Sequence, residues 1–239
     1  MALRSRLPEV RAVVVAFGGV AVWLWLFTRL HNALGKDPAS AFAHARTLRA
    51  VERTLHVDVE PAANQWLTGH PDLIQPAVIY YRSYYVVVFG VLVWTYLRHS
   101  EVFRRMRRAL VAMTILVLPV FWALPMAPPR LVLPGVVDIV AEYDPLWGPA
   151  TRDPNDDHNH FSAMPSLHVA WSLWCAYAVW SALRVRRPRW ALLAWLFPVL
   201  MIVVVVTTAN HYVLDVVGSF VLVTCSVGVA WRWGRVVDR

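Results

Sequence analysis

The sequence predicts an all-α fold: a polytopic membrane protein with six transmembrane helices and a further helix at the outer membrane surface. Of 239 residues, 58% are hydrophobic and only 16% are charged, and the mean hydropathy is +0.47. A water-soluble domain usually carries about 25% charged residues. The apolar residues form long stretches, with arginines in short patches between them. We therefore expect a single membrane domain over residues 1–239.

Six apolar segments are long enough to cross a bilayer, which takes about 20 apolar residues in a helix. They cover approximately residues 12–30, 73–97, 109–127, 162–183, 190–209 and 212–231. The third is short and contains Pro119. Tryptophans such as Trp94, Trp122 and Trp231 lie near the segment ends, as in the interfacial belt of membrane proteins.

The charged residues predict the orientation of the segments. Fifteen arginines lie at one side, within residues 4–11, 98–108, 184–189 and 232–239, together with only three acids. Most other acids lie in the remaining connections, including Asp138, Glu142, Asp144, Asp153, Asp156 and Asp157. Because cytoplasmic loops are enriched in Lys and Arg, we expect both termini in the cytoplasm. Lys36 is the only lysine, which indicates a GC-rich genome and hence a bacterial plasma membrane.

The first segment has a second interpretation. An arginine-rich start, an apolar stretch and Ala39-Ser40-Ala41 are also features of a cleaved signal peptide. The apolar stretch continues through Trp23, Trp25 and Phe27, so we favour a retained helix. Either choice leaves the other connections on the same sides of the membrane.

Two connections on the acidic side are long. In residues 38–68, apolar residues recur at helical spacing with charged residues between them, which predicts an amphipathic helix at the bilayer surface. The apolar positions are Ala41, Ala45, Leu48, Val51, Leu55 and Val59, and the charged ones are Arg46, Arg49, Glu52 and Arg53. Residues 125–161 are rich in proline and acids and are predicted to form a loop.

Charge and cysteine usage exclude two classes of protein. The net charge of +8 does not indicate nucleic-acid binding, because the basic residues are confined to patches between apolar stretches. Cys175 and Cys225 lie inside apolar stretches and offer neither a disulfide framework nor metal-ligand spacing.

The first group of candidate site residues begins the fourth segment. Pro165, Ser166 and His168 lie where the loop is expected to become a helix. Proline suits a first helical turn, whose N–H groups point outward at the positive end of the helix dipole. Such a terminus binds phosphate readily, with Ser166 adding a hydroxyl and His168 close by. The alternative is that Pro165 and Ser166 only cap the helix.

The second group lies at the start of the sixth segment and contains Asn210, His211 and Asp215. His211 and Asp215 are four residues apart, so on a helix they share one face. A carboxylate on one ring nitrogen fixes the imidazole tautomer and leaves the other nitrogen to act as a nucleophile. A polar contact between helices is the alternative, although an acid at the edge of a span is costly unless paired and used.

Two arginines are candidates for phosphate binding, because a guanidinium group can bind two phosphate oxygens at once. Arg130 follows two prolines after the third segment, and Arg82 lies inside the second. Alternatively, Arg130 is a cation that extends to the interface, and Arg82 forms a structural ion pair with Asp215 or Glu142. The predicted topology places Arg130 at the same membrane face as the other two groups.

A metal site is the rival chemistry. His158 and His160, with the run Asp153, Asn155, Asp156 and Asp157, offer ligands for zinc or calcium. The acidic run lacks the glycine and the terminal glutamate of a calcium loop. We therefore predict no metal, and favour loop solvation and contact with the substrate headgroup.

Two motifs resemble those of a known family. Pro165-Ser166-Leu167-His168 and the pair of His211 and Asp215 are similar to the second and third motifs of the type 2 phosphatidic acid phosphatase (PAP2) superfamily. Met164 and Gly218 extend the similarity toward the inositol phosphorylceramide synthase-like branch. The resemblance covers approximately residues 75–225, the expected catalytic core.

The resemblance implies a phosphohistidine mechanism. His211 would be the nucleophile and Asp215 would orient it. His168 would protonate the leaving oxygen, while Ser166 and Arg130 would hold phosphate oxygens.

Two cations of the superfamily motifs are missing from this chain. Ala123 stands where the first motif has a lysine, and Leu131 replaces the proline that follows its arginine. Val204 and Val205 stand where the third motif has Ser-Arg. Arg82 and Asn210 are therefore further candidates for phosphate binding.

The sequence thus predicts a lipid-phosphate phosphatase, multi-pass in the cell membrane, with an extracytoplasmic site and no cofactor. Transfer of a phosphoryl headgroup to an alcohol such as inositol is the alternative; hydrolysis comes first because it needs the fewest extra sites. A small transporter should carry polar residues at mid-bilayer positions, and the spans are bare of charge apart from Arg82. The expected partners are a lipid phosphate and membrane lipids, without nucleic acid, and no feature indicates an oligomeric state.

Overall fold

A computed structural model describes residues 3–145 and 158–237, with side chains from residue 16 onward. The described residues are helical and form no strand beyond an isolated parallel bridge between Met126 and Ser162. The helices are α1 (Leu3–Ala33), α2 (Pro38–Thr54), α3 (Glu60–Thr68), α4 (Pro71–Arg98), α5 (Ser100–Ala123), α6 (Pro129–Val132), α7 (Ile139–Glu142), α8 (Leu167–Leu183), α9 (Pro188–Leu193), α10 (Leu196–Thr207) and α11 (Val213–Val237).

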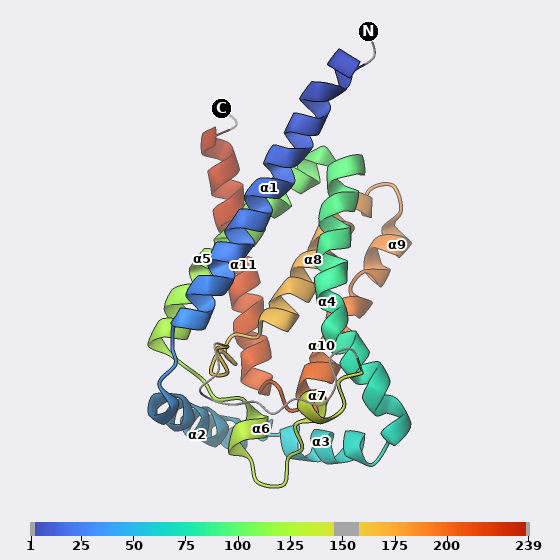
Figure 1. Ribbon diagram of the computed structural model, residues 1–239. Helices are drawn as coiled ribbons and strands as arrows, with labels where there is room; N and C mark the ends of the chain where they lie inside the picture. The colour runs from blue at the N-terminus through green and yellow to red at the C-terminus, as the bar shows by residue number, and fades with distance from the viewer. Residues whose placement is uncertain (1–2, 146–157, 238–239) are drawn as a thin grey trace.

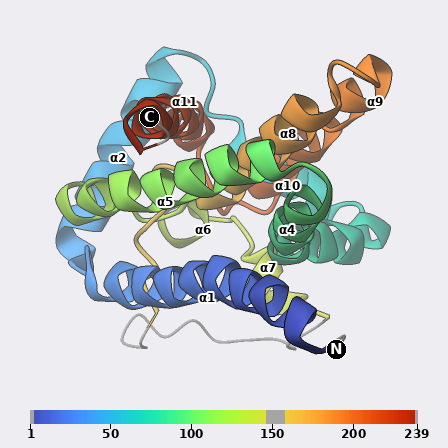
Figure 2. The same cartoon turned by 90° about the horizontal axis from the view of Figure 1, so that it is seen from above.

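The long helices run between two ends of the molecule (Figure 1). Residues 3 and 237 lie at one end, which we call the terminal end, and α2, α3, α6 and α7 gather at the opposite end. In the view from above, α1 lies at the outside of the bundle next to α5 (Figure 2). Helix α8 packs against α4, α5, α10 and α11. Its Trp174 is fully buried and donates a hydrogen bond to the Met106 carbonyl of α5 at 2.8 Å.

Four of the six predicted segments are helices long and apolar enough to cross a membrane: Pro71–Arg98, Ser100–Ala123, Pro188–Thr207 and Val213–Val237. The first predicted segment lies within α1, whose side chains are described only in part. The fourth corresponds to α8, an apolar helix of 17 residues. The chain is therefore a multi-pass membrane protein, and the count of six spans stays a prediction.

The predicted boundaries of the third segment, 109–127, are wrong. Helix α5 begins at Ser100 and ends at Ala123, so Arg104, Arg105 and Arg108 lie in its first turns and not in a connecting loop. Arginine is a good helix former, so a helix can continue where its apolar stretch stops. Hydropathy marks the apolar part of a helix and not its end.

The prediction of one surface helix over 38–68 is also wrong. The segment forms α2 and α3, separated by a turn in which His56 has a positive φ of 57°. Ala41 and Ala45 are buried as expected, but Glu52, assigned to the polar face, is buried as well. Glu52 and Glu60 are held by backbone groups of α11, and such distant contacts leave no trace in the helical periodicity.

The segment predicted as a loop, 125–161, contains the one-turn helices α6 and α7. Its two ends are tied together, since Met126 N–H donates to the Phe161 carbonyl at 2.6 Å and Ala163 N–H donates to the Met126 carbonyl at 3.1 Å. This pairing brings the residues that follow α5 beside those that precede α8.

Candidate active site

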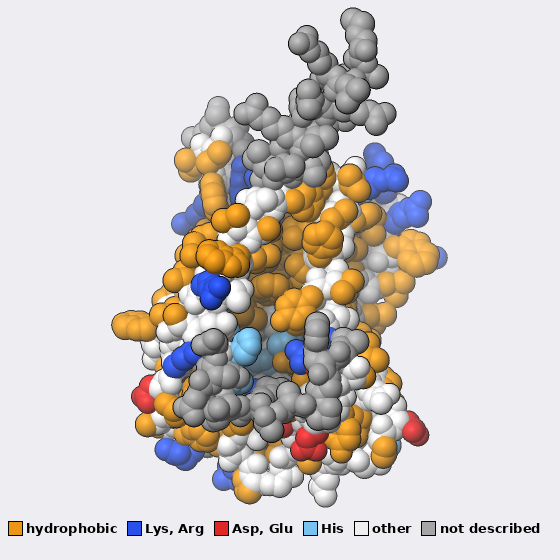
Figure 3. Space-filling view, in the orientation of Figure 1, with side chains coloured by type: hydrophobic (Ala, Val, Ile, Leu, Met, Phe, Trp, Pro, Cys, Tyr) orange, Lys and Arg blue, Asp and Glu red, His pale blue; other side chains and the backbone are white. Residues whose placement is uncertain are grey.

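A cavity of about 230 Å³ lies at the end of the bundle opposite the terminal end. Figure 3 shows histidine side chains in a recess on the side of the molecule, toward this end. The cavity is lined by His31, Tyr81, Tyr84, Tyr85, Pro128, Arg130, Asn159, His160, Ser162, Ala163, Leu167, His168, Asn210 and His211. Four of the predicted site residues are therefore brought together here: Arg130, His168, Asn210 and His211.

His211 lies in the turn between α10 and α11, outside either helix. The N–H groups of Asn210 and His211 both donate to the Val205 carbonyl, at 3.0 and 3.2 Å. Ala209 adopts a left-handed conformation with φ of 52°, which is uncommon for a residue with a side chain. The prediction that His211 and Asp215 share a helix face is thus wrong. The turn nevertheless brings their side chains within 3.4 Å of each other.

One hydrogen bond of the His211 ring fixes its tautomer. Its Nδ1 lies 2.8 Å from the carbonyl oxygen of Ala163 and 3.4 Å from Oδ2 of Asp215. A carbonyl oxygen can only accept, so Nδ1 carries the proton and Nε2 carries the lone pair. Burial lowers the pKa of His211 to about 3; the bond to Ala163 opposes this shift and the charge of Arg130 adds to it. The imidazole is therefore neutral at pH 7, as a nucleophile must be.

Asp215 is completely buried in the first turn of α11. Its Oδ2 accepts a hydrogen bond from the Tyr212 N–H at 2.8 Å, and its own carbonyl accepts one from the Ser166 N–H at 3.3 Å. Asp215 thus connects the residue before α11 with the start of α8. This arrangement holds the two motifs in a fixed relation.

Two glutamates that the sequence did not single out complete the N-terminus of α11. The Val213 N–H donates to Oε1 of Glu60 at 2.9 Å, and the Leu214 N–H donates to Oε1 of Glu52 at 2.8 Å. The first N–H groups of a helix have no partner within it, and carboxyl groups satisfy them well. Glu52 and Glu60 therefore fix the helix end that begins two residues after His211. Glu52 lies between arginines in the sequence, so no local signal marked it as buried.

The surroundings of Glu52 make the stability of the protein depend on pH. Burial raises the pKa of Glu52 to about 8 from its usual 4.5, and the nearby Glu60 and Asp215 add to the shift. As the pH rises between these values, the unfolded chain releases this proton before the folded protein does, so the free energy of unfolding falls. We expect the Tm in detergent to decrease between about pH 7 and about pH 8. His211 stays neutral in the folded protein throughout this range, because its pKa is lowered.

The matched variants are Glu52→Gln and Glu101→Gln. Glutamine resembles the protonated acid and keeps an oxygen for the Leu214 N–H, so Glu52→Gln should flatten the slope of Tm against pH. The Glu101 side chain is 76% exposed and should leave the slope unchanged when replaced. An unaltered slope in Glu52→Gln would show that this glutamate is ionised throughout.

His168 is the second residue of α8 and lies across the cavity from His211, with 5.7 Å between the ring centroids. Two tyrosines of α4 hold the imidazole in place. Tyr81 stacks on it with ring centroids 4.0 Å apart, and Tyr84 meets it edge to face at 4.6 Å. The sequence did not identify these tyrosines, because aromatic residues in an apolar span carry no signal of their own.

Ser166 has the capping role that was the alternative for it. Its Oγ accepts from the Val169 N–H at 3.4 Å, and the residue is fully buried outside the cavity lining. Pro165 precedes this cap, so the prediction that it lies in the first helical turn is wrong. A Cβ on Gly218 would lie 3.3 Å from Cβ of Pro165, so glycine permits the close approach of α11 here. Phosphate contact by Ser166 stays a prediction.

Arg130 lies in α6 and is the one lysine or arginine among the described residues of the cavity lining. Its Nη1 donates to Oδ1 of Asn210 at 2.6 Å, and its Nε lies 3.1 Å from Oδ2 of Asp138. Asn210 in turn donates to Oγ1 of Thr208 at 2.8 Å. The guanidinium is thus positioned from two sides and presented to the cavity beside His211.

Arg82 is not brought to the cavity lining. Its Nη2 and Nε donate to Oδ2 of Asp144 at 2.6 and 2.9 Å, and Asp144 is 4% exposed. The structural ion pair therefore forms, but with Asp144 and not with either of the acids that the sequence suggested. Binding of phosphate by Arg82 stays a prediction that this geometry does not favour.

Two further histidines line the cavity, His31 of α1 and His160. Nε2 of His31 lies 2.9 Å from Oγ of Ser162. Nδ1 of His31 lies 3.2 Å from Oδ1 of Asn32, so both ring nitrogens of His31 have partners within the protein. His31 follows the first apolar segment, and nothing near it in the sequence indicated a site.

The structure describes only some of the residues of the predicted metal site. Among the described residues, no group of three or more His, Cys, Asp or Glu side chains could hold a metal ion. Asp153, Asn155, Asp156 and Asp157 lie outside the described residues. His158 and His160 are described, and His160 faces the cavity.

The arrangement is suited to transfer of a phosphoryl group. It offers a neutral imidazole with an available Nε2, a second imidazole across the cavity and a positioned guanidinium. These groups can supply a nucleophile, an acid and a cation for the developing charge.

Comparison with known proteins agrees with this geometry. No curated protein and no solved structure matches the chain significantly. A family model described as the PAP2 superfamily matches residues 46–229, a range that includes both histidine motifs, the two α11-capping glutamates and Arg130. This match covers most of the sequence, and the chain therefore belongs to the PAP2 superfamily.

Proposed function

We propose that this protein is a lipid-phosphate phosphatase that works through a phosphohistidine intermediate at the outer membrane face. The observation that carries the proposal is the pair of imidazoles across one cavity, with the Nδ1 proton of His211 donated to the Ala163 carbonyl and Oδ2 of Asp215 3.4 Å from the same nitrogen. Membership of the PAP2 superfamily supports a phosphatase-type function.

In the first half of the reaction, Nε2 of His211 attacks phosphorus and the bond from phosphorus to the lipid oxygen breaks. The electron pair stays on that oxygen, which takes a proton from His168. In the second half, His168 removes a proton from water, whose oxygen attacks the phosphohistidine. Inorganic phosphate leaves and His211 is restored. Arg130 stabilises the charge on the phosphate oxygens in both halves.

An apolar groove supports a lipid substrate. A cavity of about 500 Å³ runs along α5 and α11, with Val120, Leu214, Val217 and Val221 among its lining residues. Met164 and Pro165 line this groove, and the preceding Ala163 lines the catalytic cavity. An acyl chain in the groove would place its phosphate near His211.

We propose six spans, with α1 and α8 added to the four apolar helices. The 17 residues of α8 extend only about 25 Å at 1.5 Å per residue, somewhat less than the hydrocarbon core. Its N-terminus, with His168, would then lie below the membrane surface, where a lipid phosphate can reach it. The arginines of the terminal end support a cytoplasmic location for the termini.

A phosphotransferase is the second candidate, because an alcohol such as inositol can replace water in the second half of the reaction. Membership of the inositol phosphorylceramide synthase-like branch is part of this second proposal. His31 and His160 favour it, since they extend the cavity with hydrogen-bonding groups. A transporter is disfavoured because Arg82, a charged residue inside a span, is paired with Asp144.

The test is phosphate release from a panel of lipid phosphates with long and short chains, with and without inositol. We expect phosphate release from long-chain substrates, unchanged by inositol. A phosphorylated alcohol formed at the expense of phosphate would identify a transferase. No product from any substrate would contradict both enzymatic proposals.

A pair of variants tests the groove. Val221→Trp should fill it and lower release from long-chain but not from short-chain substrates. Val229→Trp changes an exposed residue of the same helix outside the groove lining and should affect neither.

A further inference from the structure

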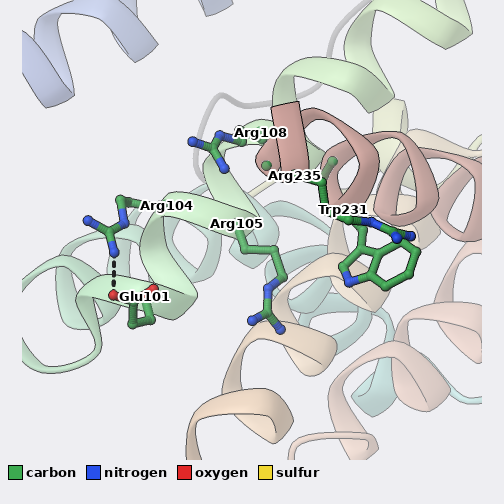
Figure 4. A pocket seen from close by; sticks show the side chains of 8 residues that line it. Glu101, Arg104, Arg105, Arg108, Trp231 and Arg235 are labelled. Atoms are coloured by element: carbon green, nitrogen blue, oxygen red, sulfur yellow. Dashed lines mark hydrogen bonds and ion pairs between the residues drawn. The ribbon is translucent and has the colours of Figure 1, made fainter. Parts of the chain in front are cut away.

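A second polar cavity lies at the terminal end of the bundle, far from the histidines. It has a volume of about 310 Å³ and is formed by the first turns of α5 and the last turns of α11. Figure 4 shows Arg104, Arg105 and Arg108 on α5 and Trp231 and Arg235 on α11, with Glu101 paired to Arg104. We call this cavity the arginine pocket.

The described lining of the arginine pocket carries more positive than negative charge. Among the described residues, four arginines line it together with one acid, Glu101, which is paired with Arg104. Like charges around a partly enclosed space repel one another more than they would in open water. An anion in the pocket would remove this repulsion, and guanidinium groups bind phosphate oxygens in a bidentate way.

The wall of the arginine pocket includes a buried residue and an aromatic ring. Ala230 is 1% exposed and forms part of its wall, while the Trp231 ring lies under Arg235, whose guanidinium carbon is 3.4 Å from the ring centroid. Arg186 and Arg187, in the connection between α8 and α9, are exposed, as are Arg104, Arg105 and Arg235, but they do not line the pocket. The two groups carry similar charge, and they differ in that the first surrounds a cavity between two helices.

We propose that the arginine pocket binds the phosphate-bearing headgroup of an anionic membrane lipid. A lipid is favoured over a soluble phosphate compound by position. The pocket lies where two apolar helices, α5 and α11, end, at the level that lipid headgroups occupy. Trp231 and Trp233 are exposed beside it, as expected for an aromatic belt at the membrane interface. Basic pockets between such helices bind anionic headgroups.

The experiment titrates the full-length protein, in zwitterionic phosphatidylcholine nanodiscs or micelles, with phosphatidylglycerol and counts bound lipids by native mass spectrometry. The pocket variant is Arg105→Gln with Arg235→Gln. The control, Arg186→Gln with Arg187→Gln, removes the same charge from the same end. We expect the pocket variant to bind phosphatidylglycerol at least about 10-fold more weakly, because two charge-assisted contacts are lost, and the control to bind it like the unchanged protein.

Folding is checked by phosphate release from a short-chain substrate, or by monodispersity in detergent if no substrate is turned over. Binding at the catalytic cavity contributes equally to all three proteins and cancels in the comparison. An equal loss in both double variants would show non-specific attraction to surface charge and overturn the proposal. Competition by millimolar inorganic phosphate or glycerol phosphate would assign the pocket to a soluble ligand instead. Equal binding of phosphatidylcholine and phosphatidylglycerol would remove the headgroup preference on which the proposal depends.

Discussion

Replacement of His211 by alanine is expected to abolish phosphate release from every substrate, whereas His168→Ala should lose activity selectively. His211 supplies the bond to phosphorus through Nε2, and no leaving group can replace a nucleophile. His168 donates a proton, so its importance depends on how strongly the leaving oxygen needs one. On a lipid phosphate, whose alkoxide leaves poorly, His168→Ala should be slower by about 10²- to 10⁴-fold. On an aryl phosphate with an acidic phenol, most of that loss should disappear.

The measurement is turnover of both variants on the two substrates, with monodispersity in detergent as the check on folding. Asp215→Asn should fall between the two histidine variants, because the imidazole remains but Asp215 no longer orients it as a carboxylate. Rescue of His211→Ala by the aryl substrate would reverse the two assignments. If neither histidine matters, the phosphohistidine proposal fails.

Arg130→Lys should lower kcat/KM by about 10²-fold or more and weaken inhibition by vanadate, which resembles the phosphorus centre during transfer. Lysine keeps the charge but loses the planar fork that contacts Asn210 and the phosphate. The matched control is Arg82→Lys, since that guanidinium belongs to Asp144 and lies outside the cavity lining. It should leave vanadate inhibition unchanged, and Arg82→Ala should reduce the yield of folded protein.

Equal loss of vanadate binding in Arg130→Lys and Arg82→Lys would mean that Arg82 reaches the phosphate after all. An unchanged inhibition constant in Arg130→Lys would assign Arg130 to structure alone. In that case His160, which also lines the cavity, would be the next side chain to test as a phosphate ligand.

Much of the fold follows from the sequence because a membrane span is a local property. The apolar stretches at 73–97, 190–209 and 212–231 lie on helices within a few residues of the predicted positions. Backbone N–H and C=O groups in hydrocarbon must be satisfied within the segment, so an apolar stretch of this length can only be helical. The ends are less predictable, as α5 shows by including the arginines from 104 to 108.

The histidines of the candidate site were also predictable, but their surroundings were not. Pro165 to His168 and His211 to Asp215 are compact motifs, and each is complete within a few residues. The tyrosines that hold His168 lie on α4, and the partner of Arg82 lies in the segment after α7. These contacts join residues far apart in the chain, and no local pattern distinguishes Tyr81 from any other aromatic residue in a span.

The sequence by itself determined that the chain enters a membrane, which histidines form the candidate site, and which superfamily it resembles. Only the tertiary structure decided how the second histidine is supported. Glu52 and Glu60 reach α11 across more than 150 residues of sequence and bind the N–H groups that the helix cannot satisfy itself. The physical reason is that a helix end needs an acceptor of the right geometry, from wherever in the chain the fold can bring one.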